Sequence, residues 1–160
     1  MKRTVLQLLR AEGYLTPDEV AERLGISREE AAAEIKRLFD EKILLGYRAV
    51  FNADKAGDDA VLAVIEVKVT PERDFGFDVI ARRIYKFPEV RTCLLLSGTY
   101  DLLLLVEGKS LRQVATFVAE KLATLEHVSS TTTHFLLRKY KEDGVIIHEE
   151  EQAERLVISA

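Results

Sequence analysis

The stretch TPDEVAERLGISREE, residues 16–30, contains two signals for the start of a helix. Thr16 is followed three residues later by Glu19, and Ser27 is followed three residues later by Glu30. In such a capping box, the hydroxyl accepts a hydrogen bond from a backbone N–H of the first helical turn, while the glutamate accepts one from the N–H of the cap residue. Each pair therefore predicts a helix that begins directly after its Thr or Ser.

The residues around these two signals describe a helix, a short turn and a second helix. Gly25 ends the first helix because glycine tolerates the positive φ found at helix C-termini. An apolar stripe at helical spacing predicts that the second helix buries one face; its members are Ala31, Ile35, Leu38 and Phe39. A further helix, which starts at Val5 and stops at Gly13, precedes both. The pattern predicts a helix-turn-helix, whose second helix can enter the major groove of DNA.

The segment that follows is expected to leave this motif as an extended linker. From residue 42 to residue 53 the apolar side chains alternate loosely along one side, which indicates an extended segment or a strand. Residues 54–59 are polar and make the best domain boundary. We therefore expect a helix-turn-helix domain with its linker strand in residues 1–53, a second domain in residues 60–141 and an acidic extension in residues 142–160.

The second domain alternates strands and helices in the order βαβ–βαβ. Residues 61–69 are β-branched and alternating, and residues 100–107 contain the leucine-rich run LLLLV, as suits a central strand buried on both faces. The other expected elements are strands at 90–97 and 128–140 and helices at 71–87 and 110–125. The predicted fold class is thus α+β: a winged-helix-like helix-turn-helix domain followed by a ferredoxin-like βαββαβ sandwich.

A ferredoxin-like sandwich leaves one face of its sheet without helices. Apolar residues occur on both sides of several predicted strands, which indicates that this open face is buried too. A second copy of the same sheet would cover it, so the pattern predicts a homodimer held by hydrophobic burial.

Length and composition exclude several classes of protein. The chain has 160 residues, 48% of them hydrophobic, and a formal net charge of -4. It is too short for an α/β barrel of about 250 residues and too apolar to be disordered. No apolar run approaches the roughly 18 to 20 residues that span a bilayer, and the single cysteine, Cys93, cannot form an internal disulfide. We expect a cytoplasmic protein with no membrane segment.

The ordered set of elements resembles the Lrp/AsnC family of bacterial and archaeal transcriptional regulators, from about Val5 to Tyr140. The resemblance is carried by LGIS at 24–27, Arg37-Leu38, ILLGYRA at 43–49, Val90, SGTYDL at 97–102, Val128 and TTT at 131–133. It implies a DNA-binding domain joined to a ligand-sensing and assembly domain. The implied partners are double-stranded DNA, a small-molecule effector such as an amino acid, and further copies of the chain, as dimers that often assemble to octamers.

By the same resemblance, DNA contact is expected from five residues: Ser27, Arg28, Lys36, Arg37 and Arg48. A plain structural interpretation stands beside this one, with Ser27 as a helix cap and the cations as a solvated helix face.

Several departures from the family pattern weaken the expectation of tight DNA binding. Residues 1–57 hold ten Lys/Arg and ten Asp/Glu, so the basic footprint of a DNA-binding domain is absent. Ala33-Glu34 stands where the family often has two basic residues, and Glu29 and Glu30 occupy the first turn. A glutamate there opposes phosphate, although it can accept a hydrogen bond from cytosine N4. Lys42 replaces the glycine that usually precedes the linker. We expect modest, salt-sensitive binding.

The expected effector site lies in the second domain. The resemblance places it at Gly98, Thr99, Tyr100 and Asp101, with Thr131 and Thr133 contributing hydroxyls near a subunit interface. Glycine would let a small ligand approach backbone amides, and Asp101 could bind an amino group. The structural alternative is a tight hairpin whose turn amides are satisfied by Asp101.

Two other functions stay open. Sirohaem decarboxylases share the architecture, but the segment that is rich in His and Arg in those enzymes reads Arg-Thr-Cys-Leu-Leu here, at 91–95. A sensor or assembly protein without DNA affinity would explain the neutral first domain. His127, His134 and His148 are far apart in sequence and Cys93 has no partner at metal-ligand spacing, so we expect no metal, no cofactor and no enzymatic activity.

Overall fold

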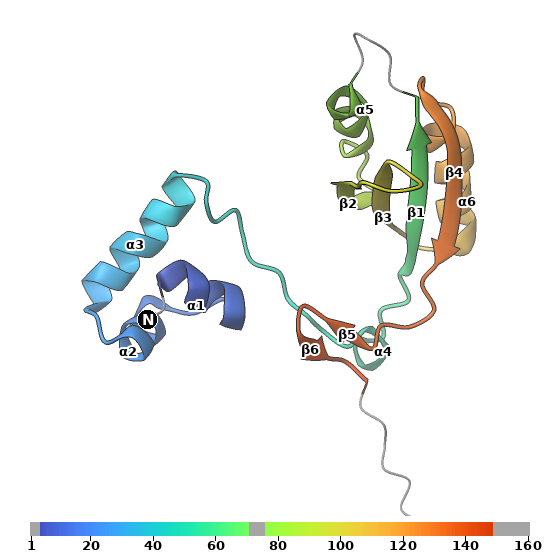
Figure 1. The fold of residues 1–160 in the computed structure, drawn as a ribbon. Helices are drawn as coiled ribbons and strands as arrows, with labels where there is room; N and C mark the ends of the chain where they lie inside the picture. The colour runs from blue at the N-terminus through green and yellow to red at the C-terminus, as the bar shows by residue number, and fades with distance from the viewer. Residues whose placement is uncertain (1–3, 71–75, 149–160) are drawn as a thin grey trace, which may run out of the picture. The chain divides into compact units, whose positions relative to one another are not determined.

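A computed structural model describes residues 4–70 and 76–148 of the chain (Figure 1). Contacts divide the chain into two compact units, Met1–Val50 and Phe51–Ala160. Each unit has its own apolar core. Among the described residues, no helix combines the length and the apolar character needed to cross a bilayer.

The first unit contains three helices, α1 (Val5–Glu12), α2 (Pro17–Leu24) and α3 (Arg28–Asp40). Both capping boxes expected from the sequence are present, and Gly25 ends α2 in the left-handed conformation with a φ of 66°. A third capping box, from Thr4 to Gln7, starts α1. The three helices bury a common core: Val5, Leu8, Leu9, Leu15, Val20, Ala21, Ala31 and Leu38. The helix-turn-helix prediction is confirmed.

Of the two alternatives expected for residues 42–53, an extended segment or a strand, the strand is wrong. Residues 44–52 belong to no helix or ladder, because no strand of the described residues pairs with them. Lys42 adopts a φ of 56°, the left-handed conformation common just after a helix. The linker ends in a short helix, α4 (Ala53–Ala56), which Asn52 caps. The described part of the first unit therefore has no strand that would form a wing.

The second unit is a four-stranded antiparallel sheet with helices on one face, as the ferredoxin-like prediction requires. The strands are β1 (Val61–Val69), β2 (Val90–Leu95), β3 (Leu102–Gly108) and β4 (Val128–Phe135), in the order β2-β3-β1-β4. The helices are α5 (Phe77–Ile84) and α6 (Leu111–Phe117), the latter continued by a π-helical turn, Val118–Leu122. Both helices pack on the same side of β1 and β3, where one core contains Ile65, Val67, Leu104, Ile80, Val114 and Phe117.

Several elements are shorter than the sequence pattern suggested. The helix expected at 71–87 covers Phe77–Ile84, and residues 71–75 lie outside the described part of the chain. Strand β2 stops at Leu95, because the Leu96 N–H bonds to the Asp101 carbonyl and closes the turn. Strand β3 was expected to be buried on both faces. In the single chain it is fully buried on its helix-facing side and half-buried on the other side.

A small hairpin follows the sheet, within the span expected to be an acidic extension from residue 142. Strands β5 (Lys141–Glu142) and β6 (Val145–Ile146) pair across Asp143 and Gly144, whose φ angles are 46° and 85°. Two positive φ angles are typical of the type I′ turn that Asp-Gly favours. Residues 149–160 of that extension lie outside the described residues.

Candidate functional sites

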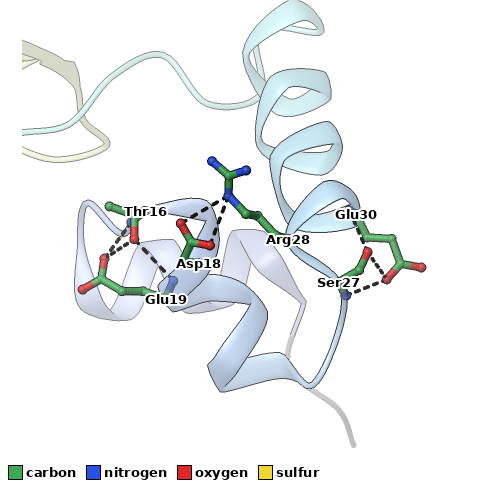
Figure 2. A network of polar contacts seen from close by, with 6 residues as sticks. All are labelled: Thr16, Asp18, Glu19, Ser27, Arg28 and Glu30. Carbon is green, nitrogen blue, oxygen red and sulfur yellow. Dashed lines mark hydrogen bonds and ion pairs between the residues drawn. The ribbon is translucent and has the colours of Figure 1, made fainter.

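The first candidate site is the outer surface of α3. Its N-terminus is fixed by Ser27, whose hydroxyl accepts a 3.1 Å hydrogen bond from the Glu30 N–H (Figure 2). The Glu30 carboxylate accepts bonds from the Ser27 N–H at 2.8 Å and from its hydroxyl at 3.0 Å. The bond from the Ser27 backbone is the main reason that the pKa of Glu30 lies below its usual value. Ser27 therefore works as a cap whether or not it also meets DNA.

Three of the four cations expected to contact phosphate are engaged with carboxylates of the same unit. Figure 2 shows Arg28 reaching over to Asp18 of α2, at 3.1 Å. Lys36 pairs with Asp40 one turn further along α3.

Arg37 lies between two carboxylates of its own helix region. It contacts Glu34 at 2.7 Å and Glu41 at 2.6 Å. Hydrogen bonds from Glu34 and Glu41 raise the pKa of Arg37 above its ordinary value.

Arg48, by contrast, is exposed in the linker, and no carboxylate of the described residues lies within ion-pair distance of it. Exposed ion pairs contribute only about 0–1 kcal/mol each, so the paired cations remain able to exchange a carboxylate for a phosphate.

The second candidate site is the loop between β2 and β3, and its backbone is tied to the end of β1. The Asp101 N–H donates to the Val67 carbonyl at 3.0 Å. The Asp101 carboxylate accepts a 2.8 Å bond from the Val69 N–H and lies 3.7 Å from the Lys68 ammonium. Lys68 in turn donates to the Thr99 carbonyl at 3.0 Å. Asp101 thus satisfies an amide of β1, not the turn amides that the structural alternative assigned to it.

Gly98 sits in this loop without a structural need for glycine. Its φ is not in the left-handed region, and a Cβ built on it would meet nothing within 4 Å. Thr99 is exposed and Tyr100 is half-buried. The loop therefore presents an open stretch of backbone at Gly98 and Thr99.

The six residues expected around an effector come from two parts of the second unit: four lie in the loop between β2 and β3, and two lie on β4. Thr131 pairs with Val67 and Thr133 with Ile65, so both threonines share the helix-covered face with those buried side chains. Lys68 points to the open face and pairs with Ser130.

The hydroxyls on the same face as Lys68 are therefore those of Ser130 and Thr132, which the sequence interpretation did not select. The strict alternation of a strand could have separated the two sets, once β1 had fixed which face is buried.

Two hollows lie elsewhere in the described part of the chain. A hollow of about 680 Å³ between α1, α2 and α3 is lined by Val5, Leu8, Leu24 and Ile26 and crossed by the ion pair of Arg23 with Glu12. A second hollow, of about 470 Å³, lies beside Asp58, Glu89 and Gly108. Neither is lined by the loop of Gly98.

No group of three or more His, Cys, Asp or Glu in the described part of the chain could hold a metal ion. Burial raises the pKa of the Cys93 thiol, which leaves it less nucleophilic.

Comparisons with known proteins agree with this arrangement. The family model described as the Lrp/AsnC ligand binding domain matches residues 62–146. The HTH-type transcriptional regulator YugG of Bacillus subtilis is 42% identical over 97% of this chain and 94% of its own length. The proline dehydrogenase transcriptional activator of Rhizobium radiobacter is 32% identical over 88% of this chain and 90% of its own.

A solved structure is similar across both units. The transcriptional regulator of Neisseria meningitidis in complex with L-Met matches with a TM-score of 0.68 and 28% identity, over 86% of this chain and 88% of that one. The helix-turn-helix, the βαββαβ unit and these matches lead to one conclusion: the chain belongs to the Lrp/AsnC family of transcriptional regulators.

Proposed function

We propose that this protein binds double-stranded DNA through α3 and regulates transcription in response to an amino acid or a related metabolite. The observation that carries the DNA-binding part is the capped helix-turn-helix, whose α3 keeps an exposed face along its whole length. Named relatives of this chain are transcriptional regulators. Because the proposed partner is chromosomal DNA, we place the protein in the cytoplasm, and we propose that it acts as a regulator and not as an enzyme.

The proposed DNA contacts are Ser27, Arg28, Lys36, Arg37 and Arg48. Three of these cations exchange a carboxylate for a phosphate on binding. This exchange reduces the favourable free energy of DNA binding, so we expect a modest affinity. The test is a salt titration of binding to the DNA upstream of the protein's own gene. Replacing both Arg28 and Arg37 by Ala should weaken binding and reduce the slope of log K against log salt by about one for each phosphate that is no longer neutralised. Arg112→Ala, in the other unit, is the matched control; an unchanged slope in the double variant would remove these arginines from the interface.

The proposed effector site is the loop of Gly98, Thr99, Tyr100 and Asp101. Support comes from Gly98, whose lack of a side chain has no explanation within the chain but would allow a ligand to reach the backbone. The related regulator from Neisseria meningitidis was solved with L-Met, which favours an amino acid as the ligand class. Thr131 and Thr133 join this site only if a neighbouring subunit completes it from the helix side. Calorimetry with a panel of amino acids tests the proposal, and the absence of binding by any of them would refute it.

We further propose that a second copy covers the open face of the sheet. Register places five apolar side chains on that face: Leu62, Val64, Leu94, Leu103 and Leu105. Burying them against their counterparts removes a large apolar surface from water and gives a symmetric dimer. Light scattering at micromolar concentration should show at least a dimer, and Leu105→Glu should shift it towards monomer. A monomeric wild type would refute the proposal.

A further inference from the structure

The face of α3 that points away from the core carries charged side chains around one small residue, and Lys36 and Asp40 on this face pair with each other. Ala31 and Leu38 are buried on the inner face of the helix. A period of 3.6 residues places Glu29, Ala33 and Lys36 on the opposite side, and all three are exposed. The alanine at residue 33 lets the helix backbone come close to a groove floor at this point.

Almost every charged side chain of α3 already has a partner. Arg28 pairs with Asp18, Glu30 with the cap residue Ser27, and Lys36 with Asp40. Figure 2 shows Arg28 and Glu30 turning away from each other towards these separate partners.

Glu34 is held by Arg37 at 2.7 Å, and Arg37 also holds Glu41. Glu29 is the exception in this helix: among the described residues no hydrogen-bond donor or cation is paired with its carboxylate. It is exposed, fixed on the first turn, and available to an outside partner.

That position is where a recognition helix contacts base edges, since the N-terminal residues of such a helix lie deepest in the major groove. A carboxylate is only an acceptor, so it cannot contact phosphate favourably and needs a donor on a base edge. Cytosine presents the N4 amino group alone in the major groove, whereas adenine presents its amino group beside the N7 acceptor, which repels a carboxylate. The place of Glu29 on the first turn of α3 and its lack of a hydrogen-bond donor therefore match cytosine better than any other base.

We propose that Glu29 is a specificity-determining residue that accepts a hydrogen bond from N4 of one cytosine in each half-site. The proposal rests on the proposed DNA-binding function and adds to it the base that α3 selects. By this proposal, the acidic first turn of α3, which repels phosphate, contributes to the recognition of the base sequence.

The test is selection of binding sites from a randomised DNA library with the full-length chain, followed by sequencing. The wild type should enrich a motif with a cytosine at one position of each half-site, preferred about 5-fold or more over other bases. In Glu29→Ala the ratio of cytosine to the other bases at that single position should fall close to one, and the preferences at the other positions should stay unchanged. Glu29→Gln should change the preferred base to adenine, because a glutamine amide can bond both N6 and N7 of adenine.

Glu22→Gln is the matched control. Glu22 is an exposed glutamate of α2, so its replacement removes the same charge from the same unit without changing α3. It should retain the wild-type motif. A wild-type motif that persists in both Glu29 variants, or one that changes equally in Glu22→Gln, overturns the role of Glu29 and leaves the proposed function standing. A wild type that enriches no sequence overturns both.

Discussion

The Asp101 carboxylate accepts a 2.8 Å hydrogen bond from the backbone N–H of Val69, a residue 32 positions earlier in the chain. The bond joins the start of β3 to the last residue of β1, and the Asp101 side chain is only 17% exposed. A residue proposed to bind an effector therefore also holds the end of the central strand β1, next to the effector loop. Ligand binding at this loop would act directly on the end of β1.

Because of this double role, Asp101→Ala and Asp101→Asn should differ in stability but not in their loss of charge. Asp101→Ala removes the acceptor and should lower the free energy of unfolding by about 1–3 kcal/mol, because it leaves the Val69 N–H without its partner. Asp101→Asn keeps an acceptor oxygen and should cost less than half as much, while both variants lose the charge that would bind an amino group. Urea unfolding and amino-acid calorimetry separate the effects. Wild-type ligand affinity in Asp101→Asn would exclude the carboxylate from the effector site.

Two glycines of the second unit should respond oppositely to alanine. At Gly108 the new Cβ would lie 2.9 Å from a methyl group of the buried Val114, so overpacking should cost about 1–3 kcal/mol. At Gly98 the Cβ meets nothing within 4 Å, so stability should stay within about 1 kcal/mol of the wild type. Amino-acid binding should instead fall in Gly98→Ala. A stable variant with full affinity would show that no ligand approaches this backbone.

Lys42 holds a backbone conformation that costs an L-residue about 1 kcal/mol. The turn after α3 requires it, since Ile43 and Leu44 both donate their N–H groups to the Leu38 carbonyl at 2.9 Å. Lys42→Gly should therefore raise the free energy of unfolding by about 0.5–1 kcal/mol. Lys42→Ala removes the same side chain but keeps the strain, so it should bring no gain. Equal stabilities of the two variants would contradict this explanation.

The capping boxes should make the first unit sensitive to acid. Hydrogen bonds from the backbone of Thr16 and of Ser27 hold the pKa values of Glu19 and Glu30 below their usual range. The unfolded chain therefore binds protons first, so this stabilisation is complete above about pH 4.5 and is lost as the pH falls through the lower, folded-state pKa values. In the double variant Glu19→Gln and Glu30→Gln, this part of the acid dependence should vanish. Unfolding followed by circular dichroism between about pH 6 and pH 3 compares the stability of the wild type with that of the double variant. Parallel plots of stability against pH would refute the prediction.

The helix-turn-helix could be predicted in detail because its signals are local. Thr16, Ser27 and Gly25 each act within one helical turn, so their effect does not depend on distant parts of the chain. The βαββαβ order followed similarly from residue alternation and apolar runs. The final hairpin had an equally local signal in Asp143-Gly144, which the sequence interpretation did not use.

The candidate sites were harder to predict because they depend on pairings between distant residues. Asp18 is ten positions from Arg28, and Val69 is 32 positions from Asp101, so neither contact has a signature in sequence spacing. The face on which a β4 hydroxyl points depends on its register with β1, which moved Thr131 and Thr133 to the helix side. The linker lacked a partner strand, and alternation alone could not reveal that lack.

The tether between the two units is shorter than the linker sequence suggests. Tyr47 still packs with the first unit, 5.2 Å from the ring of Tyr14, and Asn52 already belongs to the second, donating to the Ile147 carbonyl at 3.2 Å. Only residues 48–51 lie between these anchors, and the five steps from Tyr47 to Asn52 reach at most about 18 Å when fully extended. In the proposed dimer, joined through the second units, so short a tether would restrict the distance over which the second α3 can search once the first has bound. The resulting high effective concentration would allow two weak half-site contacts to give tight binding of the dimer to DNA.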